Sequence, residues 1–312
     1  MSRSVSQFKR ALGSVRIQGA SAVAQATLQA FAMYTRAQFA PRKTGDWVRL
    51  SRSAHSLVTL RPTEPLARNI VHWYIAELHD YAGNASSQAQ WLGYVRSLER
   101  AILEYLNETD DLITKAGERL VRPGQTIFTH CHSSLAEHIL AGARQAGKRF
   151  QVYHTETRPL FQGRITDRRL RKAKVPTVMV ADSAAAFLIS NHSGDSVKVS
   201  WLLLGADSIA RDGSVLNKVG SFGLALAAYD SKIPVYVAAP LLKVDWQGKS
   251  TFELRPAREL WPHAPPGTRA LNFAFDRVPA RYITGLITEF GIVKPSQVAR
   301  LVKQHYPWLT KS

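Results

Sequence analysis

Residues 126–140, TIFTHCHSSLAEHIL, contain the only cysteine of the 312-residue chain, Cys131. It lies where an apolar run ends and a helical pattern begins. A thiol in such a turn faces a helix N-terminus, where free backbone N–H groups and the helix dipole lower its pKa and can hold an anion. Ser134 and Glu137 have the spacing of a capping box, which marks the helix start. The stretch therefore predicts a reactive thiol, with a buried structural cysteine as the alternative.

The two histidines beside this thiol raise the question of a metal site. His130 and His132 could share one face of an extended segment, but Cys131 between them would point to the other face. No carboxylate or further histidine stands at metal-ligand spacing, and one thiol cannot supply the sulfur ligands of a structural zinc site. The sequence therefore predicts no metal.

The second half of the chain predicts the sheet that must position Cys131. After residue 125, short apolar runs rich in β-branched residues alternate with helical stretches. This alternation is typical of a Rossmann-like parallel sheet with helices on both faces, and ligands bind at the carboxyl ends of such strands. The expected strands are TIFTH (126–130), FQVYHT (150–155), VPTVMVAD (175–182), SWLLLGAD (200–207) and IPVYVAAP (233–240). The strand ends to consider first are 129–134, 155–158, 182–183, 205–208 and 240–243.

The first half predicts helices only. The stretches 19–38, 65–82 and 89–121 have apolar residues at three- and four-residue spacing, and proline and glycine separate them. We therefore expect an α/β chain with an N-terminal helical domain over 1–118 and a Rossmann-like catalytic or ligand-binding domain over 119–312.

The composition indicates the class of protein and its cellular compartment. Hydrophobic residues make up 45% and charged residues 21%, which is usual for soluble globular proteins. No run approaches the ~18 apolar residues of a membrane span, and the N-terminus lacks the apolar region of a signal peptide. A single cysteine cannot form an internal disulfide, which fits a reducing compartment. These features predict a cytoplasmic protein without a membrane partner.

The formal charge of +18 would attract polyanions such as RNA or phosphorylated metabolites. The basic residues are scattered, however, and a general surface bias explains them more simply. The densest cluster, RITDRRLRKAK (164–174), has helical spacing and no interleaved aromatic residues that could stack on bases. It indicates the solvated face of a helix, so we expect nucleic-acid binding to be weak at most.

Several strand-end motifs, taken together, resemble a known superfamily. It comprises sugar-phosphate aldose–ketose isomerases, among them the methylthioribose-1-phosphate and ribose-1,5-bisphosphate isomerases, and the regulatory α, β and δ subunits of initiation factor 2B. The amino-acid sequences of these motifs most closely resemble those of the ribose-1,5-bisphosphate isomerases. They are THCHSS (129–134), ETRPLFQGRIT (156–166), ADSAAAFL (181–188), LGADSIARDGSVLNKVGS (204–221), IPVYVAAPLLK (233–243) and NFAFDRVPARYITGLITEFGI (272–292), with weaker matches at RIQGAS (16–21) and LRPTEP (60–65).

By this resemblance Cys131 matches the catalytic thiol and Asp207 the catalytic carboxyl. In ribose 1,5-bisphosphate the anomeric oxygen is esterified, so ring opening needs an acid at the ring oxygen. A thiolate could then take the C2 proton and return a proton to C1, giving ribulose 1,5-bisphosphate. An acid and a base with separated pKa values suffice, without a metal or redox cofactor, and an apolar pocket can keep an aspartate protonated. Outside the family, a turn residue would be the simpler interpretation of Asp207.

The resemblance also implies substrate-binding residues. Asn217 and Lys218 match a substrate-contacting pair, Lys243 a further lysine, and Arg61 an arginine that reaches the substrate from the helical domain. All four suit phosphate or sugar hydroxyls. For a lone lysine or arginine among 41, surface solvation would be the commoner explanation, and the motif context is what favours binding.

The N-terminal motif departs from the isomerases. Their Arg-Gly-Ala is replaced here by Gln18, Gly19 and Ala20, followed by Ser21. Glutamine can donate a hydrogen bond to phosphate but brings no charge, and the non-catalytic initiation-factor subunits also have glutamine in this motif.

Three functions remain open on the sequence. The first is the isomerisation of ribose 1,5-bisphosphate, which the presence of both Cys131 and Asp207 favours. The second is a non-catalytic, ligand-sensing subunit like those of initiation factor 2B, which Gln18 and the charge favour. The third is an isomerase of the methylthioribose-1-phosphate type. The resemblance also implies a homo-oligomer, either a dimer or a hexamer.

Overall fold

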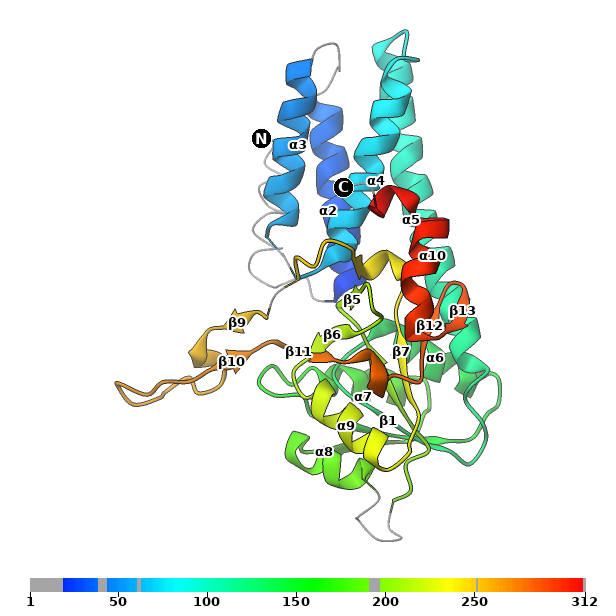
Figure 1. Ribbon diagram of the computed structural model, residues 1–312, viewed down its shortest axis with the longest axis vertical. Coiled ribbons are helices and arrows are strands. Elements are labelled where there is room, and N and C mark those ends of the chain that lie inside the picture. Colours follow the sequence, from blue (N-terminus) through cyan, green and yellow to red (C-terminus); the bar gives the residue numbers. More distant parts are fainter. Residues whose placement is uncertain (1–18, 39–43, 61–62, 191–196, 251, 311–312) are drawn as a thin grey trace.

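The computed structural model describes residues 19–38, 44–60, 63–190, 197–250 and 252–310. A bundle of long helices stands on one end of a region built around a mostly parallel sheet (Figure 1). This arrangement confirms the predicted α/β class, with helices first and a Rossmann-like sheet after them. Two residues of the predicted site, Gln18 and Arg61, lie outside the described residues.

The N-terminal helices pack through one apolar face each. In the longest helix the buried residues Trp91, Val95, Leu98, Ile102 and Leu106 recur every three or four positions, which places them on one stripe. No helix in the described ranges is long and apolar enough to cross a membrane. The helices are α2 (Ala20–Gln38), α3 (Thr44–Val58), α4 (Pro65–Ala82) and α5 (Gln88–Glu118).

Polar contacts join the bundle to the sheet region. The side chain of Asn69 in α4 donates hydrogen bonds to the carbonyls of Leu242 and Val244, and Arg68 forms an ion pair with Asp245 at 2.7 Å. The last turns of α5, which ends at Glu118, pack against a helix of the sheet region. The division of the chain into domains at residue 118 stays a prediction.

The main sheet has the order β13-β12-β7-β4-β1-β2-β3, and every neighbouring pair is parallel except β12 with β13. All five expected strands are present, and β4 is buried along its whole length, as its continuous apolar run requires. The strands are β1 (Thr126–Thr129), β2 (Gln151–Thr155), β3 (Thr177–Val180), β4 (Trp201–Gly205), β7 (Val235–Ala238), β12 (Gly285–Thr288) and β13 (Gly291–Val293).

Helices cover both faces of this sheet. α5, α6 and α7 pack together on one side, whereas α8 and α9 form a separate pair (Figure 1). The strand order runs outward in opposite directions from β1 and β4, so these two strands flank the topological switch point, where ligands bind in such folds. The helices are α6 (Ser134–Gln145), α7 (Gly163–Lys172), α8 (Asp182–Ile189), α9 (Ser221–Asp230) and α10 (Val298–His305), with 3₁₀ turns η2 (Leu241–Lys243), η3 (Ala257–Glu259), η4 (Ala280–Tyr282), η5 (Pro295–Gln297) and η6 (Pro307–Thr310).

Two further β structures were not expected from the sequence. A four-stranded sheet, β11-β6-β5-β8, lies next to the carboxyl end of β4, and a short pair, β9 with β10, belongs to an arm that projects sideways from the body (Figure 1). We use "the arm" for residues 252–273. The strands are β5 (Ser208–Ala210), β6 (Val215–Lys218), β8 (Val244–Asp245), β9 (Leu254–Arg255), β10 (Asn272–Phe273) and β11 (Phe275–Val278).

Candidate active site

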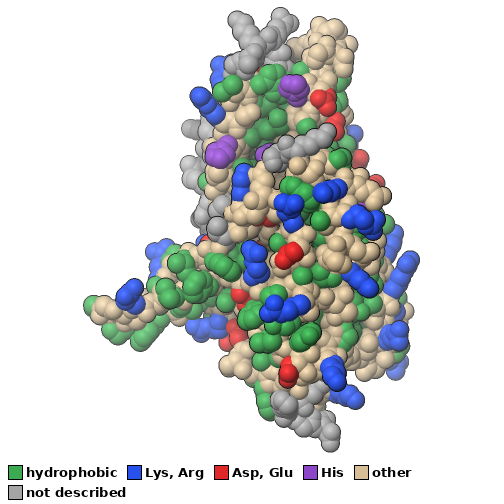
Figure 2. Space-filling model, in the orientation of Figure 1, with side chains coloured by type: hydrophobic (Ala, Val, Ile, Leu, Met, Phe, Trp, Pro, Cys, Tyr) green, Lys and Arg blue, Asp and Glu red, His purple; other side chains and the backbone are tan. Residues whose placement is uncertain are grey.

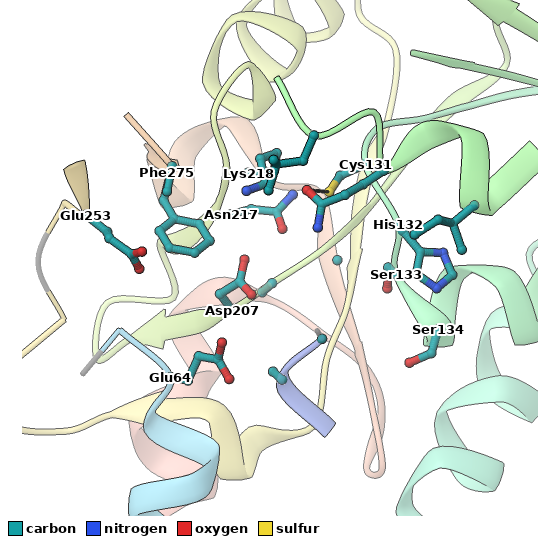
Figure 3. A pocket seen from close by; sticks show the side chains of 18 of the residues that line it. Glu64, Cys131, His132, Ser133, Ser134, Asp207, Asn217, Lys218, Glu253 and Phe275 are labelled. Carbon is teal, nitrogen blue, oxygen red and sulfur yellow. Dashed lines mark hydrogen bonds between the residues drawn. The ribbon is translucent and has the colours of Figure 1, made fainter. Parts of the chain in front are cut away.

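A cavity of about 430 Å³ opens at the switch point between β1 and β4. Every predicted site residue that the structure describes lines it, although these residues come from distant parts of the chain. Figure 3 shows Cys131, Asp207 and Lys218 around one space. The predicted residues in its wall are Gly19, Ala20, Ser21, Cys131, Asp207, Asn217, Lys218 and Lys243. Their shared location supports the predicted roles, which themselves remain predictions.

Cys131 occupies a constrained turn directly after β1. Its φ is 67°, in the left-handed region that non-glycine residues rarely adopt. Its N–H donates to Thr157 Oγ1 at 3.0 Å, and its carbonyl accepts from Thr166 Oγ1 at 2.9 Å. The thiol lies 3.5 Å from Gln162 Oε1. Such a conformation costs of order 1–3 kcal/mol and persists only when neighbouring contacts hold it, so the turn fixes the direction of the thiol.

A buried polar network stands behind this turn. His130 Nδ1 lies 2.7 Å from Thr155 Oγ1, which lies 2.9 Å from Thr157 Oγ1. The carboxylate of Asp182 accepts from the backbone N–H groups of Thr157 and Arg158 at 2.7 and 2.6 Å. Two predicted strand ends, 155–158 and 182–183, therefore support the thiol turn, and their residues are not among those that line the cavity.

The electrostatics of Cys131 differ from the sequence prediction. Burial raises the pKa of the thiol to about 11, and the nearby Lys218 ammonium only partly opposes this effect. Only 8% of the residue is exposed. The predicted lowering by the helix N-terminus is therefore wrong, because the loss of hydration of the thiolate outweighs the favourable charges.

The predicted start of α6 is also wrong by one residue. Ser133, whose backbone is extended, is the N-cap, and its side chain accepts from the N–H of Ala136. Ser134 is the first helical residue, and its expected partner Glu137 instead faces Arg169. The first turn of α6 still borders the cavity, through Ser133 and Ser134.

The two histidines have separate partners. The imidazole of His130 lies 2.9 Å from the carbonyl of Val219, and His132 Nδ1 lies 3.1 Å from Thr166 Oγ1. Burial, with Arg169 and His138, lowers the pKa of His132 to about 4, so this ring is neutral at neutral pH. Among the described residues, no three His, Cys, Asp or Glu side chains are grouped to hold a metal ion.

Asp207 and Lys243 form the side of the cavity nearest the helical bundle. Asp207 follows β4, and its backbone N–H donates to the carbonyl of Leu216. Lys243 is buried and its Nζ donates to the carbonyl of Ala206 at 2.7 Å. Burial lowers the pKa of Lys243, whereas Asp207, Asp110 and Glu64 raise it. The net effect is a lowered pKa for Lys243, because burial outweighs the three carboxyl groups.

The second sheet positions Asn217 and Lys218 at the end of β6. Asn217 is buried, and its side-chain amide donates to Ser221 Oγ at 2.8 Å. The Lys218 ammonium lies 4.9 Å from the centre of the Phe275 ring, which holds it by a cation–π contact. The ammonium therefore faces the thiol side of the cavity without an ion pair to a carboxylate among the interactions described.

A helix N-terminus also faces the cavity. Gly19 has a φ of 89°, a conformation that favours glycine, and α2 begins at the next residue. Gly19, Ala20 and Ser21 border the same cavity as the first turn of α6. Backbone N–H groups and dipoles at helix N-termini favour anions such as phosphate.

One wall of the cavity was missed by the sequence reasoning. It comes from the arm, where Arg255 forms ion pairs with Glu253 at 3.2 Å and Glu259 at 2.6 Å. Strands of only two residues leave no alternation that a sequence pattern could reveal. Glu64 was also missed, although it lies inside the LRPTEP motif. The additional lining residues include Glu64, Gln162, Arg169, Glu253, Arg255, Glu259, Asn272, Phe273 and Phe275.

Comparisons with known proteins identify several relatives of this chain. Residues 16–295 match the initiation factor 2 subunit family. A methylthioribose-1-phosphate isomerase of Geotalea uraniireducens is 33% identical over 306 residues, 91% of this chain and 85% of the relative. A ribose 1,5-bisphosphate isomerase of Archaeoglobus fulgidus is 30% identical over 295 residues, 90% of this chain and 87% of the relative. The crystal structure of translation initiation factor eIF-2B from Pyrococcus horikoshii superposes with a TM-score of 0.79 at 25% identity, covering 95% of this chain and 99% of that one.

Proposed function

Because the chain belongs to the initiation factor 2 subunit family and has a thiol and a carboxyl in one cavity, we propose that it is an aldose–ketose isomerase of sugar phosphates. The observation that carries the proposal is that Cys131 and Asp207 line the same cavity at the switch point, together with Lys218 and Lys243. The named relatives, which are isomerases of ribose 1,5-bisphosphate and methylthioribose 1-phosphate, support this reaction class.

Within this class we propose ribose 1,5-bisphosphate as the substrate. The N-termini of α2 and α6 both border the cavity, and two such ends suit a molecule with two phosphate groups. Lys218 adds a positive charge on the thiol side. The relatives are divided between the two substrates, so the choice rests on these features of the cavity.

The reaction needs four proton transfers, two at each group, so that both groups return to their starting states. Asp207 donates a proton to the ring oxygen as the C1–oxygen bond of the ring breaks. The Cys131 thiolate takes the proton from C2, which leaves an enol phosphate with a C1–C2 double bond. The thiol then delivers a proton to C1 while the C2 hydroxyl loses its proton to the Asp207 carboxylate, giving the ketose. Atoms and charges balance without a further reactant.

The raised pKa of Cys131 sets a condition on this mechanism. A thiol with a pKa of about 11 is almost fully protonated at neutral pH. The small thiolate fraction is a strong base, and Lys218 is the largest influence that increases it. The same protonated thiol favours the second candidate function, in which the protein binds a phosphorylated ligand without converting it.

Incubation with each sugar phosphate decides between these functions. The protein is mixed separately with ribose 1,5-bisphosphate and methylthioribose 1-phosphate, and the ketose phosphate is detected by NMR. We expect ribulose 1,5-bisphosphate to form, with loss of turnover in Asp207→Asn. Conversion of methylthioribose 1-phosphate alone would show that this sugar phosphate, and not ribose 1,5-bisphosphate, is the substrate. Tight binding of either sugar without conversion would replace the enzyme by a ligand-sensing protein.

A further inference from the structure

Glu64 is a buried carboxyl in the cavity that the mechanism above does not use. It directly precedes α4, but its side chain makes no cap hydrogen bond to that helix. Only 3% of the residue is exposed, and it lines the cavity together with the half-buried Asp207. Figure 3 shows the Glu64 carboxyl pointing toward that of Asp207. The predicted acid therefore has a second carboxyl near it.

One buried lysine lies close to both carboxyls. The Nζ of Lys243 donates to the carbonyl of Ala206, the residue before Asp207, at 2.7 Å. Asp207, Asp110 and Glu64 all lie near enough to raise its pKa, although burial lowers the pKa overall. In the described part of the chain, three carboxyls thus lie around one lysine, whose charge can offset at most one of them. A second carboxylate in the same buried space is unfavourable, so this group retains a proton.

We propose that Glu64 and Asp207 share one proton at neutral pH, and that Glu64 thereby keeps Asp207 able to act as an acid. Glu64 is in this sense a positioning residue, because it acts through Asp207 and not on the sugar. Only the use of the proton in the reaction rests on the proposed function; the sharing of the proton does not.

The pair suits both steps assigned to Asp207. Asp207 gives its proton to the ring oxygen as the C1–oxygen bond breaks, and the pair then carries two negative charges. The repulsion between them makes the Asp207 carboxylate a better acceptor for the proton that the C2 hydroxyl later releases. The shared proton is thereby restored, and no further reactant is needed.

The other charged groups around the pair come from separate elements. Lys218 on β6 acts on the thiol of Cys131, which is protonated at neutral pH and adds no charge. Glu253 of the arm forms an ion pair with Arg255 at 3.2 Å. Burial raises the pKa of Asp110 on α5, which weakens its competition for the buried ammonium. We therefore assign the retained proton to the two carboxyls that face each other in the cavity.

Infrared spectroscopy of the full-length protein at neutral pH tests the shared proton without any substrate. The C=O stretching band of a protonated carboxyl is separate from the bands of a carboxylate, so its intensity measures the number of protonated carboxyls. The samples are the wild type, Glu64→Gln, Asp207→Asn and the double variant. Glu253→Gln is the matched control, because Glu253 lines the same cavity but is paired with Arg255. Circular dichroism establishes that each variant is folded.

We expect each single substitution to remove the intensity of one protonated carboxyl. The double variant should remove no more than either single one, because the proton belongs to the pair. Glu253→Gln should keep the wild-type intensity, and so should Glu64→Asp, which retains a carboxyl. An unchanged band in Glu64→Gln would overturn the inference, and so would the loss of two protonated carboxyls in the double variant.

The pH dependence of kcat/KM for ribose 1,5-bisphosphate tests the consequence for the reaction. Because the thiolate fraction increases with pH, kcat/KM should rise until Asp207 loses its proton and level off there. Glu64→Gln should lower the pH of this levelling by at least about one unit, since no neighbouring carboxylate then opposes the ionisation of Asp207. A changed KM with an unmoved profile would make Glu64 a sugar-binding group and overturn its assigned role. A wild type that shows the shared proton but forms no ketose would refute the proposed reaction and leave the carboxyl pair standing.

Discussion

The backbone N–H of Cys131 donates to Thr157 Oγ1 at 3.0 Å, and both residues have left-handed φ values, 67° and 62°. Two unfavourable turns, one after β1 and one after β2, therefore hold each other in place. Asp182 binds the N–H of Thr157 and so connects the end of β3 to the same pair. Three neighbouring strand ends thus fix the position of one thiol.

The first prediction concerns the removal of this thiol. Cys131→Ser should lower turnover of the true substrate by several orders of magnitude, because a serine hydroxyl is far harder to deprotonate than a thiol. The measurement is steady-state kinetics with ribose 1,5-bisphosphate, with circular dichroism to show that the variant is folded. Near-normal turnover of Cys131→Ser would remove the thiol from the mechanism, and His132→Asn would then be the next variant to measure.

The second prediction follows from the raised pKa of Cys131. Because burial disfavours the thiolate, the reactive fraction should keep increasing about tenfold per pH unit up to at least pH 9.5. Iodoacetamide labels the single cysteine, and mass spectrometry measures the labelling rate at each pH. In guanidinium the same thiol should level off near pH 9, since a free thiol has a pKa of about 8.5. A plateau of the labelling rate below pH 8 in the folded protein would instead show that the helix N-terminus lowers the pKa of Cys131.

The third prediction tests the departure at Gln18. If this side chain meets a phosphate, Gln18→Arg should add a charge-assisted contact of about 1 kcal/mol and lower KM roughly fivefold. The effect on kcat should be small, because a remote phosphate is bound similarly in the ground and transition states. Gln145→Arg adds the same charge at an exposed position on α6 and serves as the control. Unchanged or weaker binding of every sugar bisphosphate by a folded Gln18→Arg protein would favour the ligand-sensing function.

The fourth prediction concerns the net charge of +18. Lysine and arginine side chains are spread over the visible face in Figure 2 without one dominant stripe. RNA binding should therefore be weak and disappear between about 50 and 200 mM salt, as nonspecific phosphate contacts do. Fluorescence anisotropy with a labelled single strand measures this. Tight binding that persists at the higher salt concentration would connect the protein to translation components.

The fifth prediction concerns the close approach behind the thiol turn. A Cβ at Gly163, the first residue of α7, would lie 1.9 Å from the carbonyl oxygen of Thr155. Gly163→Ala should therefore lower the free energy of unfolding by about 1–3 kcal/mol, measured by urea denaturation. Gly93→Ala on α5 is the control: its Cβ would meet nothing within 4 Å, and alanine favours a helix by about 1 kcal/mol. Equal stability of both variants would contradict this account of the turn.

The main sheet was predictable because its strands carry their own signal. Runs such as TIFTH and SWLLLG are continuously apolar since both faces of these strands are covered, and the alternation with helices implies parallel pairing. The four-stranded sheet carries no such signal. Its strands are only two to four residues long. β5 and β6 pair with each other locally, but their outer partners β8 and β11 lie far along the chain, and such pairing depends on the tertiary structure.

The identity of the site residues could be predicted from the motifs, but the pKa of Cys131 could not. The motifs brought Cys131, Asp207 and Lys218 to attention, and the structure places all three in one cavity. The pKa of the thiol depends on the water excluded from it, which no local pattern of residues reveals. Similarly, two adjacent serines fit a helix start almost equally well, and only the extended backbone of Ser133 identifies the cap.

The walls of the cavity come from two separate parts of the fold. The thiol and carboxyl stand on strand ends of the central sheet, whereas Arg255, Glu259 and Asn272 reach the cavity from the arm, which no strand of that sheet depends on. Insertions or substitutions in the arm can therefore change the shape of the cavity while Cys131 and Asp207 keep their positions. Under the proposed function, the substrate preference of this scaffold can therefore change without any change in the two residues proposed to transfer protons.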